Sequence, residues 1–174
     1  MVRRWFVLAL VLVVVAWSCG ASPHNPPAER AFYYWRTTFR LSAAERTALA
    51  AARATKLYVR VFDVEWNATE DRPGLVGVIA ADETLPPGIE FVPVVFLRQD
   101  VFAHLDAGRL GELANSTWRE VSRRAKALGG APRELQLDCD WTDTTRDRFF
   151  DYVRRLRAEA QGLKLSATIR LHQV

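Results

Sequence analysis

The sequence predicts an α/β fold and, within that class, a partial (β/α)₈ barrel of the TIM type. Segments rich in β-branched and aromatic residues alternate along the chain with segments of helical periodicity. That alternation is typical of parallel strands joined by right-handed crossovers. Polar residues also recur on one face of the last two predicted strands, as in the lumen of a barrel. We therefore expect about five parallel strands with intervening helices.

An open, doubly wound sheet is the competing architecture. A dinucleotide-binding sheet of that kind has a glycine-rich turn after an early strand, whereas Thr37-Thr38-Phe39-Arg40 follows the first predicted strand here. A complete barrel needs about 250 residues and eight strands. The chain has 174 residues, so we expect the first part of a longer barrel, truncated at its C-terminus, or a barrel that another chain completes.

The predicted elements follow one another without an internal repeat. Strands are expected at 31–37, 57–67, 89–97, 134–142 and 163–173. The capping box Ser42-Ala43-Ala44-Glu45 begins a helix that ends near residue 54. Further helices are expected at 101–107, at 112–128, and from a cap at Thr142 or Asp143 to about residue 160. Residues 71–88 are rich in Pro and Gly and predict an irregular excursion with a short strand at 75–79.

The N-terminus predicts export. Residues 1–19 combine Arg3 and Arg4 with an apolar run that is shorter than the roughly 20 residues of a membrane span, which is typical of a signal peptide. Cys19 ends this run in the position of a bacterial lipobox cysteine, which predicts lipidation and a membrane anchor in the cell envelope. Ordinary cleavage after Ala21 is the alternative. Residues 20–30 read as a Pro-rich tether, and residues 31–174 as the barrel domain.

Composition excludes several partners. The net charge of +4 is mild and no basic stripe is interleaved with aromatic residues, so nucleic acid is not expected. The three histidines are scattered, and no metal-binding or cofactor-binding motif occurs, so we expect no metal and no cofactor. If Cys19 is lipidated, Cys139 is a buried free thiol; a disulfide between the two is the alternative.

The segment 134–142 carries the candidate chemistry. Its apolar residues alternate with Gln136, Asp138 and Asp140, so both aspartates lie on the polar face near the carboxyl end of the strand, where barrel enzymes keep their active sites. In the segment 163–173, Arg170 and His172 belong to the polar face. Asp138, Asp140, Arg170 and His172 are therefore the candidate catalytic residues, and a structural ion-pair network in the lumen is the alternative reading.

A second group of residues suits substrate binding. Asp63 and Glu65 lie near the end of the strand 57–67, and glycoside hydrolysis requires two carboxyl groups across the scissile bond. Trp35, Trp66 and Trp141 lie near strand ends, where they could stack on sugar rings or fill the core.

Five blocks of sequence carry a resemblance to a known family. They are Phe32-Tyr33-Tyr34-Trp35-Arg36-Thr37, the strand from Tyr58 to Asn67, Pro93-Val94-Val95-Phe96, the segment from Leu135 to Thr142, and the segment from Thr168 to Val174. Together they resemble the bacterial family called domain of unknown function 3142. The resemblance implies a longer, exported or lipid-anchored protein whose fold is related to that of the barrel glycoside hydrolases.

The strand end at Asp138 is also similar to the Asp-x-Asp-x-Glu pattern of chitinase-type hydrolases. Asp138 and Asp140 match the two aspartates, but Thr142 occupies the place of the catalytic glutamate and cannot act as a general acid. Two functions therefore stay open: a glycoside hydrolase-like protein that acts on a glycan in the cell envelope, and a non-catalytic, surface-anchored glycan-binding or scaffold module.

Overall fold

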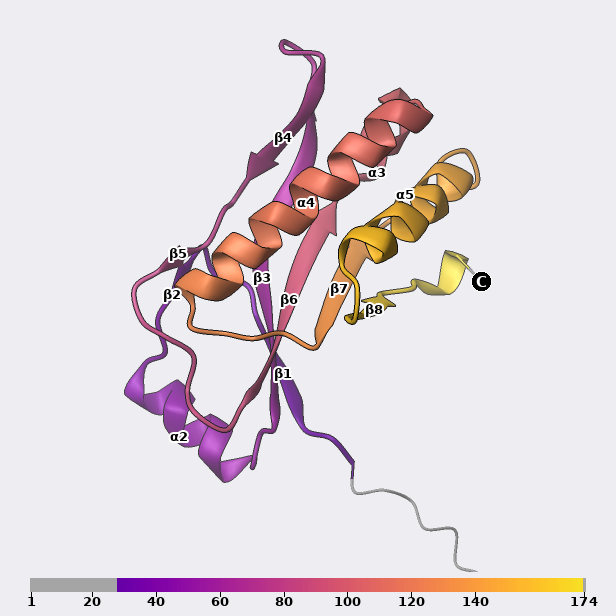
Figure 1. The fold of residues 1–174 in the computed structure, drawn as a ribbon. Coiled ribbons are helices and arrows are strands. Elements are labelled where there is room, and N and C mark those ends of the chain that lie inside the picture. The colour runs from indigo at the N-terminus through magenta and orange to yellow at the C-terminus, as the bar shows by residue number, and fades with distance from the viewer. Residues whose placement is uncertain (1–27, 174) are drawn as a thin grey trace, which may run out of the picture.

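The computed structural model of the chain describes residues 28–173, except the side chain of His172. The predicted signal peptide with Cys19, and most of the tether, lie outside the described residues. Within them the fold is an α/β structure with one mostly parallel sheet (Figure 1). No helix of residues 28–173 is both long and apolar enough to cross a membrane.

Five parallel strands form the main sheet. They are β1 (Ala31–Tyr34), β3 (Lys56–Asn67), β6 (Glu90–Leu97), β7 (Glu134–Cys139) and β8 (Lys164–Ala167). Their order in the sheet is their order along the chain, and all four pairings are parallel. A doubly wound sheet would instead reverse direction at a switch point. The α/β class and the five parallel strands are thus confirmed, whereas no closed barrel forms among the described residues.

Three helices cover one face of the sheet (Figure 1): α3 (Gln99–His104), α4 (Ala107–Ala127) and α5 (Arg146–Glu159). Leu110, Leu113, Thr117 and Val121 recur at helical spacing and give α4 a buried face. With Phe149, Tyr152 and Leu156 of α5, they pack against the apolar face of the strands. Burial of this face stabilises the fold by roughly 25 cal/mol per Å² of apolar surface.

Helix α2 (Ala43–Ala51) lies apart from this layer, near the amino ends of the strands (Figure 1). It has no buried residue. The predicted capping box is present: Glu45 N donates to Ser42 Oγ, and Ser42 N donates to the Glu45 carboxylate. The helix begins where the sequence predicted and ends three residues earlier than expected.

The connection from β3 to β6 contains no helix. β4 (Arg72–Val76) runs back antiparallel to the end of β3, and β5 (Ala80–Ala81) then pairs with β2 (Thr38–Phe39). The short strand expected at 75–79 is therefore part of a hairpin that begins at Arg72. The first half of this strand was not predicted, because Pro73 and Gly74 usually argue against a strand, although an edge strand tolerates proline.

The last predicted strand was wrong in its second half. β8 ends at Ala167, and Leu171–Gln173 form a short 3-10 helix. Thr168 N still bonds to Leu137 O, but the pairing ends there, although β7 continues for two more residues to Cys139. The carbonyl groups of Cys139 and Trp141 accept hydrogen bonds from the Gln173 side-chain amide instead. The alternation of polar residues on a strand therefore does not extend to Arg170 and His172.

Helix α5 begins later than expected. Residues 143–145 form a turn, and Thr145 is the N-cap residue rather than Thr142 or Asp143. The hydroxyl group of Thr145 accepts a hydrogen bond from Thr142 N, which fixes the turn. Cys139 is buried beneath this layer and forms no disulfide within residues 28–173. Burial, then the charges of Asp140 and Asp138, raise the pKa of its thiol to about 12.

Candidate functional site

The face of the sheet opposite the helices carries most of the polar side chains. We call it the open face. Its central strand contributes Val92 and Val94, which are 0% exposed yet do not belong to the core cluster beneath the helices. Tyr58 and Arg60 of β3 pair with these valines on one side, and Gln136 of β7 pairs with Val94 on the other. The long polar and aromatic neighbours thus cover the centre of the open face.

An irregularity in β3 brings Asp63 to this face. The register of β3 against β6 shifts between Arg60 and Phe62, which is a β-bulge. Val61 and Phe62 are both fully buried, so the strand places two consecutive side chains in the core. Without the bulge, Asp63 would share the core-facing side with Val59 and Val61.

The bulge sets Arg60 and Asp63 side by side. Arg60 Nε donates to Asp63 Oδ1 at 2.5 Å, and Nη2 contacts the second carboxylate oxygen, so the pair is bidentate. Asp63 is 7% exposed. The hydrogen bonds that Arg60 donates to Asp63 outweigh desolvation and raise the pKa of Arg60. At Gly77, which has a φ of 56°, a methyl group would lie 2.6 Å from Arg60 Nη2, so the glycine makes room for the guanidinium group.

The carboxyl end of β7 meets the segment that follows β8. Thr168 Oγ1 donates to Asp138 Oδ1, and Arg170 forms an ion pair with Asp140. The structure therefore brings three of the four predicted catalytic residues to one strand end. The backbone of His172 lies in the 3-10 helix of the same segment, and its side chain is outside the described part of the chain.

Three aromatic rings form a row across β1 and β3, which we call the aromatic row. Tyr33 stacks on Tyr58 at 4.8 Å between ring centroids and on Trp35 at 6.0 Å. Tyr33 and Tyr58 are register partners, and Trp35 follows Tyr33 by two residues, so all three rings lie on the open face. Tyr33 and Trp35 are each 47% exposed. The Tyr33 hydroxyl group donates to Gln136 Oε1 across the face.

The amino end of the open face holds a charged network. Glu134, 3% exposed, accepts hydrogen bonds from Lys164 Nζ at 3.0 Å and from Ser166 Oγ at 2.5 Å, and Lys56 Nζ lies 3.7 Å away. Burial raises the pKa of Glu134, but these donors and charges outweigh burial and leave the pKa below its ordinary value. This network lies at the amino ends of the strands, away from Asp138, and its groups satisfy one another, as in a structural network.

The other predicted substrate-binding residues are more dispersed. Glu65 lies beyond Asp63 and is 4.0 Å from Arg98. Trp66 faces the helix side, where His104 stacks on it at 4.5 Å and the Arg109 guanidinium group lies over its ring. Trp141 is buried in the core beside Phe150. Of the three tryptophans, Trp35 is the one whose ring lies on the open face.

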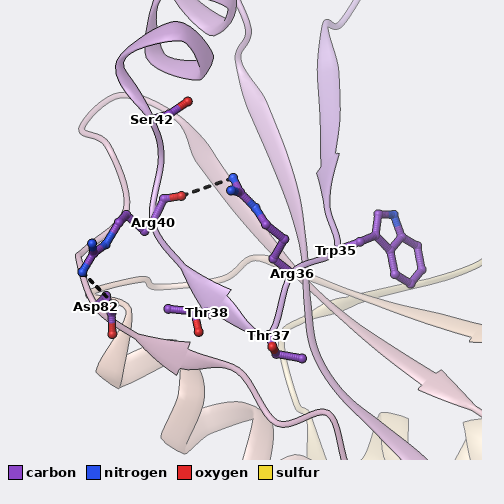
Figure 2. Close-up of a pocket in the computed structure, with 7 residues that line it drawn as sticks. All are labelled: Trp35, Arg36, Thr37, Thr38, Arg40, Ser42 and Asp82. Carbon is purple, nitrogen blue, oxygen red and sulfur yellow. Dashed lines mark hydrogen bonds and ion pairs between the residues drawn. The ribbon is translucent and has the colours of Figure 1, made fainter.

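A hollow of about 690 Å³ adjoins the end of β1 (Figure 2). Arg36 and Arg40 line it, and both are engaged by carboxylates: Arg36 by Glu45 at 2.5 Å and Arg40 by Asp82 at 2.9 Å. Figure 2 shows Trp35 directed away from Arg40 and Asp82. The polar residues of this hollow therefore contact one another around the turn and the cap of α2, and they are separate from the open face.

The geometry limits the chemistry of the carboxylates. Asp63, Phe96 and Asp138 stand in one row of the sheet, so the two aspartates are two strands apart. At about 4.8 Å between neighbouring strands, their Cα atoms are roughly 9–10 Å apart.

Thr142, which stands where a chitinase-type hydrolase has its catalytic glutamate, bonds to Thr144 and Thr145 in the turn before α5. Within residues 28–173, no group of three or more acidic, histidine or cysteine side chains could hold a metal ion.

Several residues of the open face were not predicted from the sequence. Arg60 could have been found, because the apolar alternation of β3 changes phase at the consecutive residues Val61 and Phe62, and such a change marks a bulge. The aromatic row could not have been found in full, since the pairing of Tyr33 with Tyr58 depends on the register of two strands. The same holds for the contacts of Glu134.

Comparisons with known proteins add one structural likeness. No family model matches the chain, and no curated protein is similar to it in sequence. Among solved structures, the chain is similar to the crystal structure of Bacteroides thetaiotamicron EndoBT-3987 with Man5GlcNAc product, with a TM-score of 0.48 and 11% sequence identity. The likeness covers 89% of this chain and 41% of that one, so the chain spans less than half the length of that protein.

Proposed function

We propose that this chain binds a glycan on the open face of its sheet. The observation that carries the proposal is the aromatic row, in which Trp35 is the outer ring of the stack and Tyr33 and Trp35 are each about half exposed. Sugar rings have apolar faces that stack on aromatic side chains and hydroxyl groups that bond to carboxylates. Asp63 and Asp138 lie toward the carboxyl ends of β3 and β7, and Asp140 directly follows β7; their carboxylates are the candidate acceptors.

The test is a binding titration with a panel of neutral and acidic oligosaccharides. Trp35→Ala removes the outermost ring of the row and is expected to weaken binding about three- to tenfold, the usual contribution of one aromatic contact. Phe150→Ala is the matched control, because Phe150 is a similarly exposed aromatic residue on α5, on the other side of the sheet. Equal affinities for Trp35→Ala and the unaltered protein would contradict the proposal.

Glycoside hydrolysis is the second candidate function. The row position of Asp63 and Asp138 favours it, because their estimated Cα separation is close to the roughly 6.5–9.5 Å that separates the carboxyl groups of inverting enzymes. If the pair is catalytic, Asp138→Asn abolishes the release of reducing sugar while oligosaccharide binding persists. NMR of the first product then shows an inverted anomeric centre. Binding without any released sugar leaves glycan binding as the function.

The remaining parts of the proposal concern the whole protein. We infer a (β/α)₈-type barrel, because the strand order follows the chain order, and membership of the family called domain of unknown function 3142, on the five sequence blocks. Export and lipidation at Cys19 are supported by the apolar run before it. Metabolic labelling with a radioactive fatty acid tests the anchor: label is expected in the protein and absent from Cys19→Ser.

A further inference from the structure

A second concave surface lies on the helix side of the sheet, between the β3–β4 hairpin and α4. We call it the hairpin groove. Its volume is about 730 Å³, within the range of small-molecule sites. The groove exists because the connection from β3 to β6 supplies a returning strand where a barrel crossover places a helix. It is separated from the open face by the sheet itself.

The floor of the groove is apolar. Val64 and Leu113 form the floor and are buried, while Leu75 stands in the wall and is 44% exposed. Gly74 and Ser116 also line the groove. A large exposed leucine over an apolar floor suits an apolar ligand body.

Charged side chains surround this floor. Arg72 pairs with Glu70 at the hairpin, and Arg109 contacts the ring of Trp66, the backbone carbonyl of Asp71 and, at 3.9 Å, the Asp71 carboxylate. Two further lining residues of α4 remain: Arg119 and Glu112 make no ion pair within residues 28–173. They are seven residues apart, two helical turns or roughly 10 Å. The groove thus has three arginines and two glutamates in its lining.

The edge of β4 argues against an extended peptide as the occupant. Pro73 is paired with Trp66 in the ladder, and proline has no N–H to donate. Its nitrogen therefore faces the free edge, where it interrupts the row of donors that an added strand would need. Recognition in the groove then depends on side chains, which favours a compact ligand.

We propose that the hairpin groove binds a compact organic anion. Its carboxylate or phosphate group pairs with Arg119, and its aromatic or aliphatic body packs on Leu75 and Leu113. Because Arg72 and Arg109 already contact carboxylates, Arg119 is the arginine of the lining that is left to contact an anion. The apolar floor favours an organic anion over a simple inorganic ion. This proposal is independent of glycan binding, because the two surfaces lie on opposite sides of the sheet.

NMR titrations of the isotope-labelled protein with phenyl phosphate and with phenylacetate test the proposal, with benzyl alcohol as the uncharged probe. Saturable shifts are expected for the amides of Leu75, Leu113 and Ser116 with both anions, and much weaker ones with benzyl alcohol. Arg119→Gln is expected to weaken anion binding about three- to fivefold, as for one exposed charge contact, and Glu112→Gln to strengthen it.

The controls separate charge from folding and from the glycan site. Arg157→Gln removes an exposed arginine from α5 and is expected to leave the affinity unchanged. Ser116→Phe fills the groove and is expected to abolish the shifts, while thermal unfolding shows that the variant is folded. Equal binding of benzyl alcohol and the anions, an unchanged affinity in Arg119→Gln, or shifts confined to residues of the open face would each overturn the proposal.

Discussion

Two consecutive buried residues, Val61 and Phe62, decide the direction of Asp63. A strand alternates its side chains strictly, so one inserted residue moves every later side chain to the other face. The bulge turns Asp63 toward the open face and Trp66 toward the helices. It occurs where the free edge of β3 changes partner from β1 to β4. The composition of the candidate site therefore depends on a local irregularity rather than on the regular strand pattern.

Gly77 leaves the space that the Arg60 side chain needs for its contact with Asp63. Gly77→Ala is expected to be destabilising twice over: alanine is unfavourable at a φ of 56°, and its methyl group would push Arg60 away from Asp63. We expect a loss of about 2–4 kcal/mol in the free energy of unfolding, measured by urea denaturation. Gly88→Ala is the matched control, because Gly88 also has a positive φ but nothing lies within 4 Å of the added methyl group. A similar loss in both variants would mean that the contact with Arg60 contributes nothing.

Arg60 stabilises the fold through the carboxylate it neutralises. Arg60→Met leaves Asp63 nearly buried without its bidentate partner, and we expect a loss of about 2–3 kcal/mol, toward the low end for a broken buried pair. The double variant Arg60→Met/Asp63→Leu removes both charges, so it should recover part of that loss in the same denaturation experiment. A double variant less stable than Arg60→Met alone would show that the pair is not coupled in this way.

Among the helices and strands, those with strong local signals were predicted well. The capping box at Ser42 and the continuous apolar segment of β6 depend on residues that are neighbours in sequence. The start of α5 was misplaced, because Thr142, Asp143 and Thr145 can all cap a helix and the contacts of the turn decide among them. The end of β8 was misplaced because the pairing stops at Ala167 although β7 continues to Cys139, and the contacts of Gln173 with the Cys139 and Trp141 carbonyl groups, which take the place of a longer strand, depend on the tertiary fold.

The stability of helix α2 depends mainly on local interactions such as its N-terminal cap. It buries no residue, so its cap carries an unusual share of its stability. Ser42→Ala is expected to cost about 1 kcal/mol locally, which increases the rate of amide hydrogen exchange within residues 43–51 while the global unfolding midpoint changes little. Thr47→Ala keeps the cap and raises helix propensity, so exchange in the same residues should slow. Unchanged exchange in Ser42→Ala would mean that tertiary contacts hold the helix.

For the molecule as a whole, the α/β fold class could be predicted from the sequence, but whether the sheet closes into a barrel could not. The order of the five parallel strands agrees with a barrel, yet the sheet among the described residues is open, with β1 and β8 at its edges. Closure depends on whether the edge strands find pairing partners, and that is decided by contacts between distant strands rather than by local sequence. The open face carries both the residues of the proposed function and, at its amino end, the charged network of Glu134.

Stability against acid should depend on glutamates distributed over the molecule. Hydrogen bonds from Arg36 and Ser42 lower the pKa of Glu45 to about 2. The pKa of Glu134 is also below its ordinary value, since its donors outweigh the effect of burial. The unfolded chain therefore takes up these protons first as the pH falls. The stabilisation is complete above about pH 4.5 and is lost as the pH drops through the lower pKa values of the folded state.

Glu134→Gln isolates one part of this dependence. The variant loses the charged partner of Lys164 and Lys56, so it should be less stable than the unaltered protein at neutral pH. The difference should shrink as the pH falls below about 4.5, because the unfolded reference chain then takes up a proton at Glu134, and it should vanish once the pH is also below the lowered pKa of the folded protein. Chemical denaturation at a series of pH values measures it, with Asp143→Asn, an exposed acid in the turn before α5, as the control. A difference that stays constant down to acid pH would assign the stabilisation by Glu134 to shape rather than to charge.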